Sequence, residues 1–470
     1  MNKRTRNIIL LVVILQVFLI GGLLALPTAV QAVPGRYRVA LAERYPAVSE
    51  VAEGMIERVA PVATALPAPA AVQASAEEVD LGALIGTEPT AVPTVPPTFT
   101  PEPTVAVVEE TAVNTAALPT ATIAPTATPE PTIEPTPELP PRPAQVRLEG
   151  IEPVRQTFNN CGPSNLVQVM TYHGATVTQE EVASYLKPNP EDRNVSPWQI
   201  ADYVNETTFG QFKAGAYAGG TLEMVKQFVA AGLPVVIEKG YYPNVDNAPG
   251  WWGHYLTVFG YDDEKEEIYS LDTYLGPFDG SGRVDSYEEI ELYWQQFNYA
   301  FYIVYEPQQE ALVQQILGPT LLDEQAMWRN TAAIAEQQTR QEPDNAFAWF
   351  NVGTSLTQLG ELTGEPQYYQ GGAQAFDTAR EIGLPPRMLW YQFRPYYAYL
   401  KTGRYQDIID LANATLETQG GRNVEETYWH KGHALLFLGD VAGAAEAYRE
   451  ALRANPNFYP AQISLDSIGG

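Results

Sequence analysis

The hydrophobic and polar positions of the 470-residue chain follow four successive patterns. A nearly unbroken apolar run comes first and is followed by a long stretch without periodicity. Alternating positions typical of strands come next, and apolar positions at helical spacing complete the chain. These patterns divide it into four segments, which are residues 1–32, 33–145, 146–307 and 320–470.

The first segment has the features of a membrane anchor. Three basic residues within residues 1–7 precede the apolar run of residues 8–26, which is close to the length of about 20 residues that crosses a bilayer as a helix. The basic flank predicts that the rest of the chain lies outside the cytoplasm. Residues 30–32 could serve as a signal-peptidase site, and cleavage there would release a secreted protein. The length of the run favours an uncleaved, single-pass anchor.

The second segment is predicted to be a juxtamembrane stretch and a disordered Pro/Thr-rich linker. Between residues 61 and 141 there is no Lys or Arg, and Pro, Thr, Ala, Val and Glu dominate. Such a composition buries too little apolar surface to fold, and frequent proline keeps the chain extended. We expect this linker to hold the later domains away from the membrane.

The charge and the cysteine content narrow the possible functions. With 56 acidic and 28 basic residues the net charge is -28, which argues against a nucleic-acid partner because phosphates are repelled. A single cysteine, Cys161, excludes an intrachain disulfide and leaves a free thiol that calls for a reason. One Cys and scattered His show no metal-ligand spacing, so we expect neither metal nor cofactor.

Cys161 is predicted to begin a helix. Pro163 suits a first helical turn, and the apolar positions of residues 166–170 follow at helical spacing. A helix N-terminus favours the thiolate, which is the nucleophilic form of cysteine. Gln156, five residues earlier, is a candidate side-chain donor to an oxyanion, although by itself it would more often be an ordinary surface residue.

A thiolate nucleophile needs a general base, and the chain has only four histidines. We interpret His173, at the end of the predicted helix, as structural, while His430 and His433 lie in the last segment. His254 remains, and the β-prone residues after it predict that it begins a strand.

A hairpin is predicted to bring His254 close to Asp272. If the turn is centred on Asp263, these two residues lie directly opposite one another, with Cβ atoms about 5 Å apart. A four-residue turn would shift this pairing by one. An Asp in that place would fix the imidazole tautomer and stabilise the imidazolium.

Taken together, these residues resemble a known family. Gln156, the blocks 160–163, 253–255 and 260–262, and Asp272 are similar to the papain-like cysteine peptidases related to the bacteriocin-processing, double-glycine-leader peptidases. The resemblance covers about a third of the chain and includes no ATP-binding cassette.

The resemblance implies a papain-like α+β fold and an active site in this domain. Cys161 would be the nucleophile, His254 the base, Asp272 the orienting group and Gln156 part of the oxyanion hole. The implied substrate is a peptide or a protein. One departure from the family concerns the residue after Asp272, which is often Pro in the family and is Thr273 here.

The last segment is predicted to be an all-α solenoid of tetratricopeptide repeats. The clearest copy spans residues 428–456, and weaker copies begin at Trp349 and Leu389. Such solenoids offer a surface for a peptide or protein partner, and the alternative is a packing platform for the peptidase domain.

The sequence therefore predicts a membrane-tethered cysteine peptidase that acts outside the cytoplasm. Two other readings stay open at this point. One is a non-catalytic scaffold that recruits partners, and the other is an acyl transferase that uses the same three residues, since hydrolysis and transfer both pass through a thioester.

Overall fold

The computed structural model describes a large part of the chain. The described residues are Gln16, Gly21, Tyr37, Arg44 and residues 65–70, 79–86, 141–242, 250–418 and 420–470, which all belong to one compact unit. Apart from Gln16 and Gly21, the predicted membrane anchor lies outside them, and so does most of the predicted linker. No helix within these residues combines the length and the apolar character that crossing a membrane requires.

Residues 141–307, which we call the sheet region, contain one antiparallel sheet of seven strands. Along the sheet the strands are β2 (Lys213–Tyr217), β7 (Phe301–Tyr305), β3 (Val235–Tyr241), β4 (Trp252–Asp262), β5 (Glu267–Asp272) and β6 (Arg283–Ser286). The short strand β1 (Gln145–Arg147) pairs with the second half of β4. The sheet and its helices form an α+β architecture.

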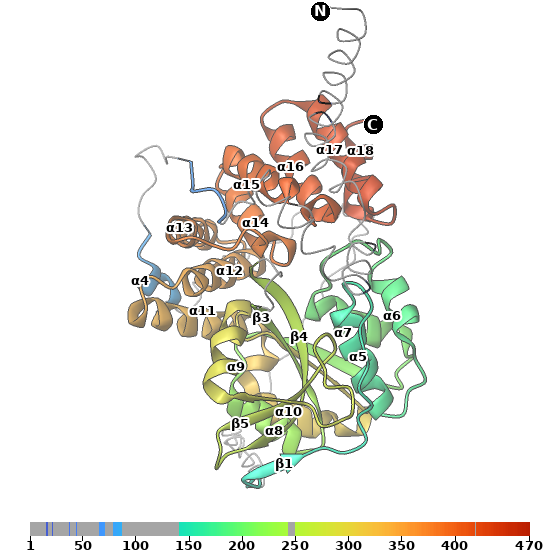
Figure 1. Cartoon of the computed structure of the whole chain (residues 1–470). Coiled ribbons are helices and arrows are strands. Elements are labelled where there is room, and N and C mark those ends of the chain that lie inside the picture. Colours follow the sequence, from blue (N-terminus) through green and yellow to red (C-terminus); the bar gives the residue numbers. More distant parts are fainter. Residues whose placement is uncertain are drawn as a thin grey trace, which may run out of the picture. The chain divides into compact units, whose positions relative to one another are not determined.

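Helices cover both faces of this sheet, because alternate residues of its central strands are apolar on both sides. Helices α5 (Cys161–Tyr172), α6 (Gln179–Leu186) and α7 (Pro197–Thr207) lie on one side (Figure 1). The core there joins apolar residues of α5 and α7 to Val236 and Tyr302 of the sheet. Phe301, which points to the other face, meets α8 (Leu222–Ala230) and α9 (Tyr287–Trp294).

The hairpin of β4 and β5 differs from the predicted register. Asp272 pairs with Leu256, two residues from His254, so the prediction of a directly opposite pair was wrong. The strands end at the pair Asp262 and Glu267, which leaves a four-residue turn instead of one centred on a single residue. A β-bulge between Val258 and Gly260 then shifts the register once more.

The described part of the chain from residue 310 onward, which we call the helical region, contains helices and no strand. They are α10 (Glu310–Leu322), α11 (Glu324–Gln341), α12 (Ala346–Thr363), α13 (Pro366–Ile382), α14 (Arg394–Lys401), α15 (Tyr405–Glu417), α16 (Glu425–Phe437), α17 (Val441–Ala454) and α18 (Tyr459–Ser467). Helix pairs occupy all three predicted repeat copies. In the clearest copy, a Cβ on Gly432 would lie 2.4 Å from the ring of Tyr448, so the glycine permits this close packing. The assignment to tetratricopeptide repeats stays a prediction.

Two pieces of the predicted disordered linker have a defined structure, which corrects that prediction for residues 65–70 and 79–86. The first piece is extended, and the second contains the short helix α4 (Leu81–Gly86), which contacts α11 and α13 (Figure 1). Leu66 and Leu84 are only 5% and 7% exposed. The helical region thus supplies the apolar surface that the linker composition lacks.

The sheet region and the helical region share a hydrophobic core. Trp251, which precedes β4, stacks on Phe297 with ring centroids 5.5 Å apart. It also meets two rings of the helical region, Phe347 at 5.9 Å and Tyr391 at 5.7 Å. This shared core places the loop before α14 beside the start of β4, where His254 lies.

Candidate active site

The thiol of Cys161 lies at the start of α5, as the sequence predicted. The residue is half-buried, and the helix behind it is almost fully buried. Lys187 fixes the approach to the helix, because its ammonium donates to the carbonyl of Asn159 at 2.6 Å and to Asn160 Oδ1 at 3.2 Å. A first helical residue has a backbone N–H without a partner inside the helix, so Cys161 offers both a nucleophile and a donor.

His254 and Asp272 form a buried pair at the adjoining ends of β4 and β5. The imidazole Nε2 lies 3.0 Å from Oδ1 of Asp272, and the two residues are 6% and 4% exposed. The backbone N–H groups of Tyr274 and Leu275 donate to the same oxygen at 2.8 and 2.9 Å. These donors hold the carboxylate in place, so that it can orient the imidazole.

The electrostatics of these side chains favour an ion pair. Burial opposes ionisation of the Cys161 thiol, but its hydrogen bond with His254 and the positive charges of His254 and Lys187 hold its pKa below the usual value. Burial likewise opposes protonation of His254, but Asp272 and the thiol raise its pKa to about 9. Burial would raise the pKa of Asp272, yet the imidazolium keeps it far below its usual range. Each of the two groups thus favours the charged form of the other, the thiolate of Cys161 and the imidazolium of His254.

Gln156 is held at the end of β5 by the residue that follows Asp272. Its backbone N–H donates to the carbonyl of Thr273 at 2.8 Å, and the Thr273 hydroxyl donates to Gln156 Oε1 at 2.8 Å. The second bond fixes the amide plane and leaves the Nε2 group as a donor. Thr273 is fully buried, so it is a rigid support for this amide.

A buried polar network joins the helix of Cys161 to the strand of His254. Asn165, one turn after Cys161, donates to the carbonyls of Cys161 at 2.9 Å and Tyr255 at 3.2 Å. Its Oδ1 accepts a bond from Thr257 Oγ1 at 2.7 Å. Because Asn165, Tyr255 and Thr257 are buried, a break would leave an unpaired polar group, and the network fixes the distance between helix and strand.

The helical region contributes a further side chain to this place. Tyr391 packs against the α-carbon of Gly253, where an added Cβ would lie 2.9 Å from its ring. Its carbonyl accepts a bond from Asn194 Nδ2 at 3.2 Å, so the loop is tied to the sheet region on both sides of the site. Burial and the nearby charge of Cys161 raise the pKa of the Tyr391 phenol, which therefore stays neutral.

Two arginines lie over a cluster of three large rings, one of which, Trp390, packs against Tyr391. Arg387 lies over Trp252 at 4.2 Å and over Trp390 at 5.2 Å from the ring centroids. Arg193 lies over Phe158 at 4.7 Å and over Trp390 at 5.5 Å. This cluster connects the segment before Cys161, the segment before His254 and the helical region.

The structure brings the four proposed site residues into one place. Cys161 hydrogen-bonds with His254, His254 pairs with Asp272, and Gln156 is bound to the residue after Asp272. The remaining histidines lie elsewhere. His173 caps the C-terminal end of α5, and His430 and His433 pack against aromatic rings of the helical region.

Sequence reasoning missed three supporting residues. Asn165 could have been identified from the sequence, since a polar side chain four residues after Cys161 lies on the same helix face. Thr273 was noticed only as a departure from the family. Tyr391 could not have been identified from the sequence, because its role depends on a contact between segments about 140 residues apart. Among the described residues, no group of three or more His, Cys, Asp or Glu side chains is arranged to hold a metal ion.

Part of the chain is similar to known proteins. Residues 146–302 match the model of the Peptidase_C39 like family. We call this segment the C39-like region; it is about a third of the chain. A solved structure described as a C39-like peptidase from Bacillus anthracis matches with 17% identity over 34% of this chain and 98% of that one, at a TM-score of 0.28. No curated protein matches the chain.

Proposed function

We propose that the C39-like region is a cysteine peptidase that hydrolyses peptide or protein amide bonds. The observation that carries this proposal is the position of His254, which interacts with the Cys161 thiol on one side and with the Asp272 carboxylate on the other. A nucleophile, a base and an orienting acid in this order are the requirement for thiol-based acyl transfer. The match to the Peptidase_C39 like family supports the same class of reaction.

In the proposed reaction, the Cys161 thiolate attacks the carbonyl carbon of the scissile amide. The carbonyl oxygen becomes an oxyanion, to which the Gln156 amide and the backbone N–H of Cys161 donate hydrogen bonds. The protonated His254 gives its proton to the leaving amine as the C–N bond breaks. Water then attacks the thioester, gives a proton back to His254, and releases the acid together with the Cys161 thiolate.

The proposal includes a location and a role for the helical region. The basic start and apolar run of the first segment support an anchor with the C39-like region outside the cytoplasm. Tyr391 supports a second role, because the helical region reaches the site directly and therefore belongs to the catalytic unit as well as offering a surface for partners.

The test uses the full-length protein and a peptide library analysed by mass spectrometry. Wild type should cleave a subset of peptides, and a peptide with an electrophilic group should label Cys161. Folded Cys161→Ala should do neither. Cleavage by folded Cys161→Ala at the wild-type rate would contradict the proposal. Adding a primary amine separates the acyl-transferase reading, since a transferase would give the amide of that amine as the main product.

A further inference from the structure

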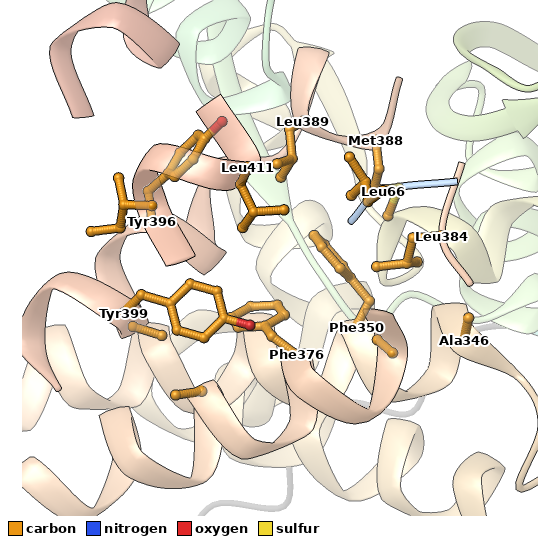
Figure 2. Close-up of a cluster of buried hydrophobic side chains, with 14 of the residues drawn as sticks. Leu66, Ala346, Phe350, Phe376, Leu384, Met388, Leu389, Tyr396, Tyr399 and Leu411 are labelled. Carbon is orange, nitrogen blue, oxygen red and sulfur yellow. The ribbon is translucent and has the colours of Figure 1, made fainter. Parts of the chain in front are cut away.

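The helical region binds an extended segment of its own chain. Residues 66–70 read Leu-Pro-Ala-Pro-Ala and lie along the helical region with the Leu66 side chain 5% exposed. The leucine side chain packs into the hydrophobic cluster of the helical region, in which its neighbours include Phe350, Leu384 and Leu389 (Figure 2). Burial of this one side chain determines which residue of the segment lies at this position on the helical region.

The backbone of the segment is bound as well. Arg380 of α13 donates from Nε to the carbonyl of Pro67 at 2.9 Å and from Nη2 to the carbonyl of Ala68 at 3.0 Å. At the two ends, Leu66 N–H donates to the carbonyl of Leu384 at 2.9 Å and Ala70 N–H donates to Asp407 Oδ1 at 3.0 Å. The remaining positions include two prolines, which have no N–H to satisfy.

The residues that hold the backbone are also held by other side chains of the helical region. Arg380 is 3% exposed, and its Nη1 donates to Asp407 Oδ1 at 2.8 Å and to the hydroxyl of Tyr399 at 3.0 Å. Arg404 donates to the other oxygen of Asp407 at 3.0 Å. A guanidinium held on one side by a buried carboxylate presents its other donors in a fixed direction, which lowers the ordering cost of binding.

We infer that this surface is a peptide-binding site for extended segments of the type Leu-Pro-X-Pro-X, and that residues 66–70 are its occupant in this chain. Arg380 is paired with Asp407, so the site favours a neutral peptide over an acidic one. Proline suits it because it is already extended and leaves no unpaired donor. Residues 66–69 are the only Leu-Pro-X-Pro sequence in the chain, which singles out this segment among its many proline-rich stretches.

The test measures binding of a labelled peptide that has the sequence of residues 63–72. The emptied protein is the full-length chain with residues 66–70 replaced by glycine and serine, and it should bind the peptide saturably. Wild type should bind at least about tenfold more weakly, because its own segment competes at a high effective concentration. In the emptied protein Arg380→Ala should lose at least about tenfold in affinity, whereas Arg453→Ala, on the exposed face of α17, should not.

Two results would overturn the inference. One is equal affinity of the peptide for wild type and for the emptied protein. The other is equal affinity of the emptied protein for a peptide in which Leu66 is replaced by serine. If the emptied protein does not fold, hydrogen exchange of the intact chain decides instead. The amides of Leu66 and Ala70 should exchange slowly in wild type, and Asp407→Asn should speed the exchange of Ala70. Exchange of both amides at the rate of a free peptide would refute the site. Neither experiment depends on peptidase activity.

Discussion

The carboxylate of Asp272 reaches His254 diagonally across the β4–β5 hairpin. Asp272 lies opposite Leu256, and since alternate residues of a strand share a face, its side chain is on the same face as that of His254. Without the bulge at Phe259, Asp272 would lie opposite Thr257 and point to the other face. The additional residue in β4 is therefore what brings base and carboxylate together.

The first prediction concerns this pair. Asp272→Asn removes the charge that contributes most to raising the pKa of His254 to about 9, so the pKa of His254 should fall. Turnover should fall by about 10²- to 10⁴-fold, and the alkaline limit of the pH profile should move to lower pH. Steady-state kinetics between pH 5 and pH 10 check this, with melting curves to show that the variant is folded. An unchanged alkaline limit would mean that another group orients His254.

The second prediction concerns the support of Gln156. Thr273→Val removes the hydroxyl that holds the Gln156 amide but keeps the shape of the side chain. Loss of a whole oxyanion donor costs about 10²- to 10³-fold in kcat, so a misplaced donor should cost up to about 10²-fold with little change in KM. Thr273→Ser, which keeps the hydroxyl, should retain most of the activity. Equal kcat values for the Val and Ser variants would show that the Thr273 hydroxyl does not position Gln156.

A third prediction concerns Gly253. An alanine there would place its Cβ 2.8 Å from Phe297 and 2.9 Å from Tyr391, and such overpacking typically costs about 1–3 kcal/mol. Gly253→Ala should therefore lower the melting temperature and reduce turnover, because the strain falls on the residue before His254. Gly250→Ala is not a suitable control, since Gly250 has a φ of +74°. Gly162→Ala, whose Cβ would meet its neighbours at 3.5 Å, should affect stability less.

The fourth prediction tests whether the helical region contributes to catalysis through Tyr391. Tyr391→Leu should lower kcat, because the ring that packs on Gly253 beside His254 is lost. Tyr391→Phe keeps the ring and should stay close to wild type. Tyr405→Leu serves as the matched control, since Tyr405 stacks on Phe437 within the helical region. If Tyr391→Leu matches this control in kcat, the contact is only structural.

The sequence predicted the helix start at Cys161 and a strand that begins at His254, because proline placement and β-branched or aromatic runs are local signals. The helix start is confirmed, and the strand begins two residues earlier, at Trp252. The register could not be predicted in the same way. It depends on a left-handed turn residue, Glu266 at φ 54°, and on a bulge, neither of which has a strong composition signal.

Long-range contacts explain the other differences between prediction and structure. The composition of residues 65–70 predicts disorder when the segment is considered alone. Its order comes from Arg380, more than 300 residues further along the chain, and from apolar side chains of the helical region. The contact of Tyr391 with Gly253 could not be predicted for the same reason. Local patterns identify the elements that carry reactive groups, but they do not identify the partners that other segments supply.

The rate at which iodoacetamide alkylates Cys161, followed against pH, tests the central claim most directly. In wild type the imidazolium of His254 holds the pKa of the thiol below its usual value, so fast alkylation should persist below the pH of about 8.5 at which a free thiol ionises. In His254→Ala the thiol loses the charge and the hydrogen bond of His254, which oppose the effect of burial, and the profile should move to higher pH. If wild type and His254→Ala gave the same profile, that of an ordinary thiol, Cys161 would not be an activated nucleophile.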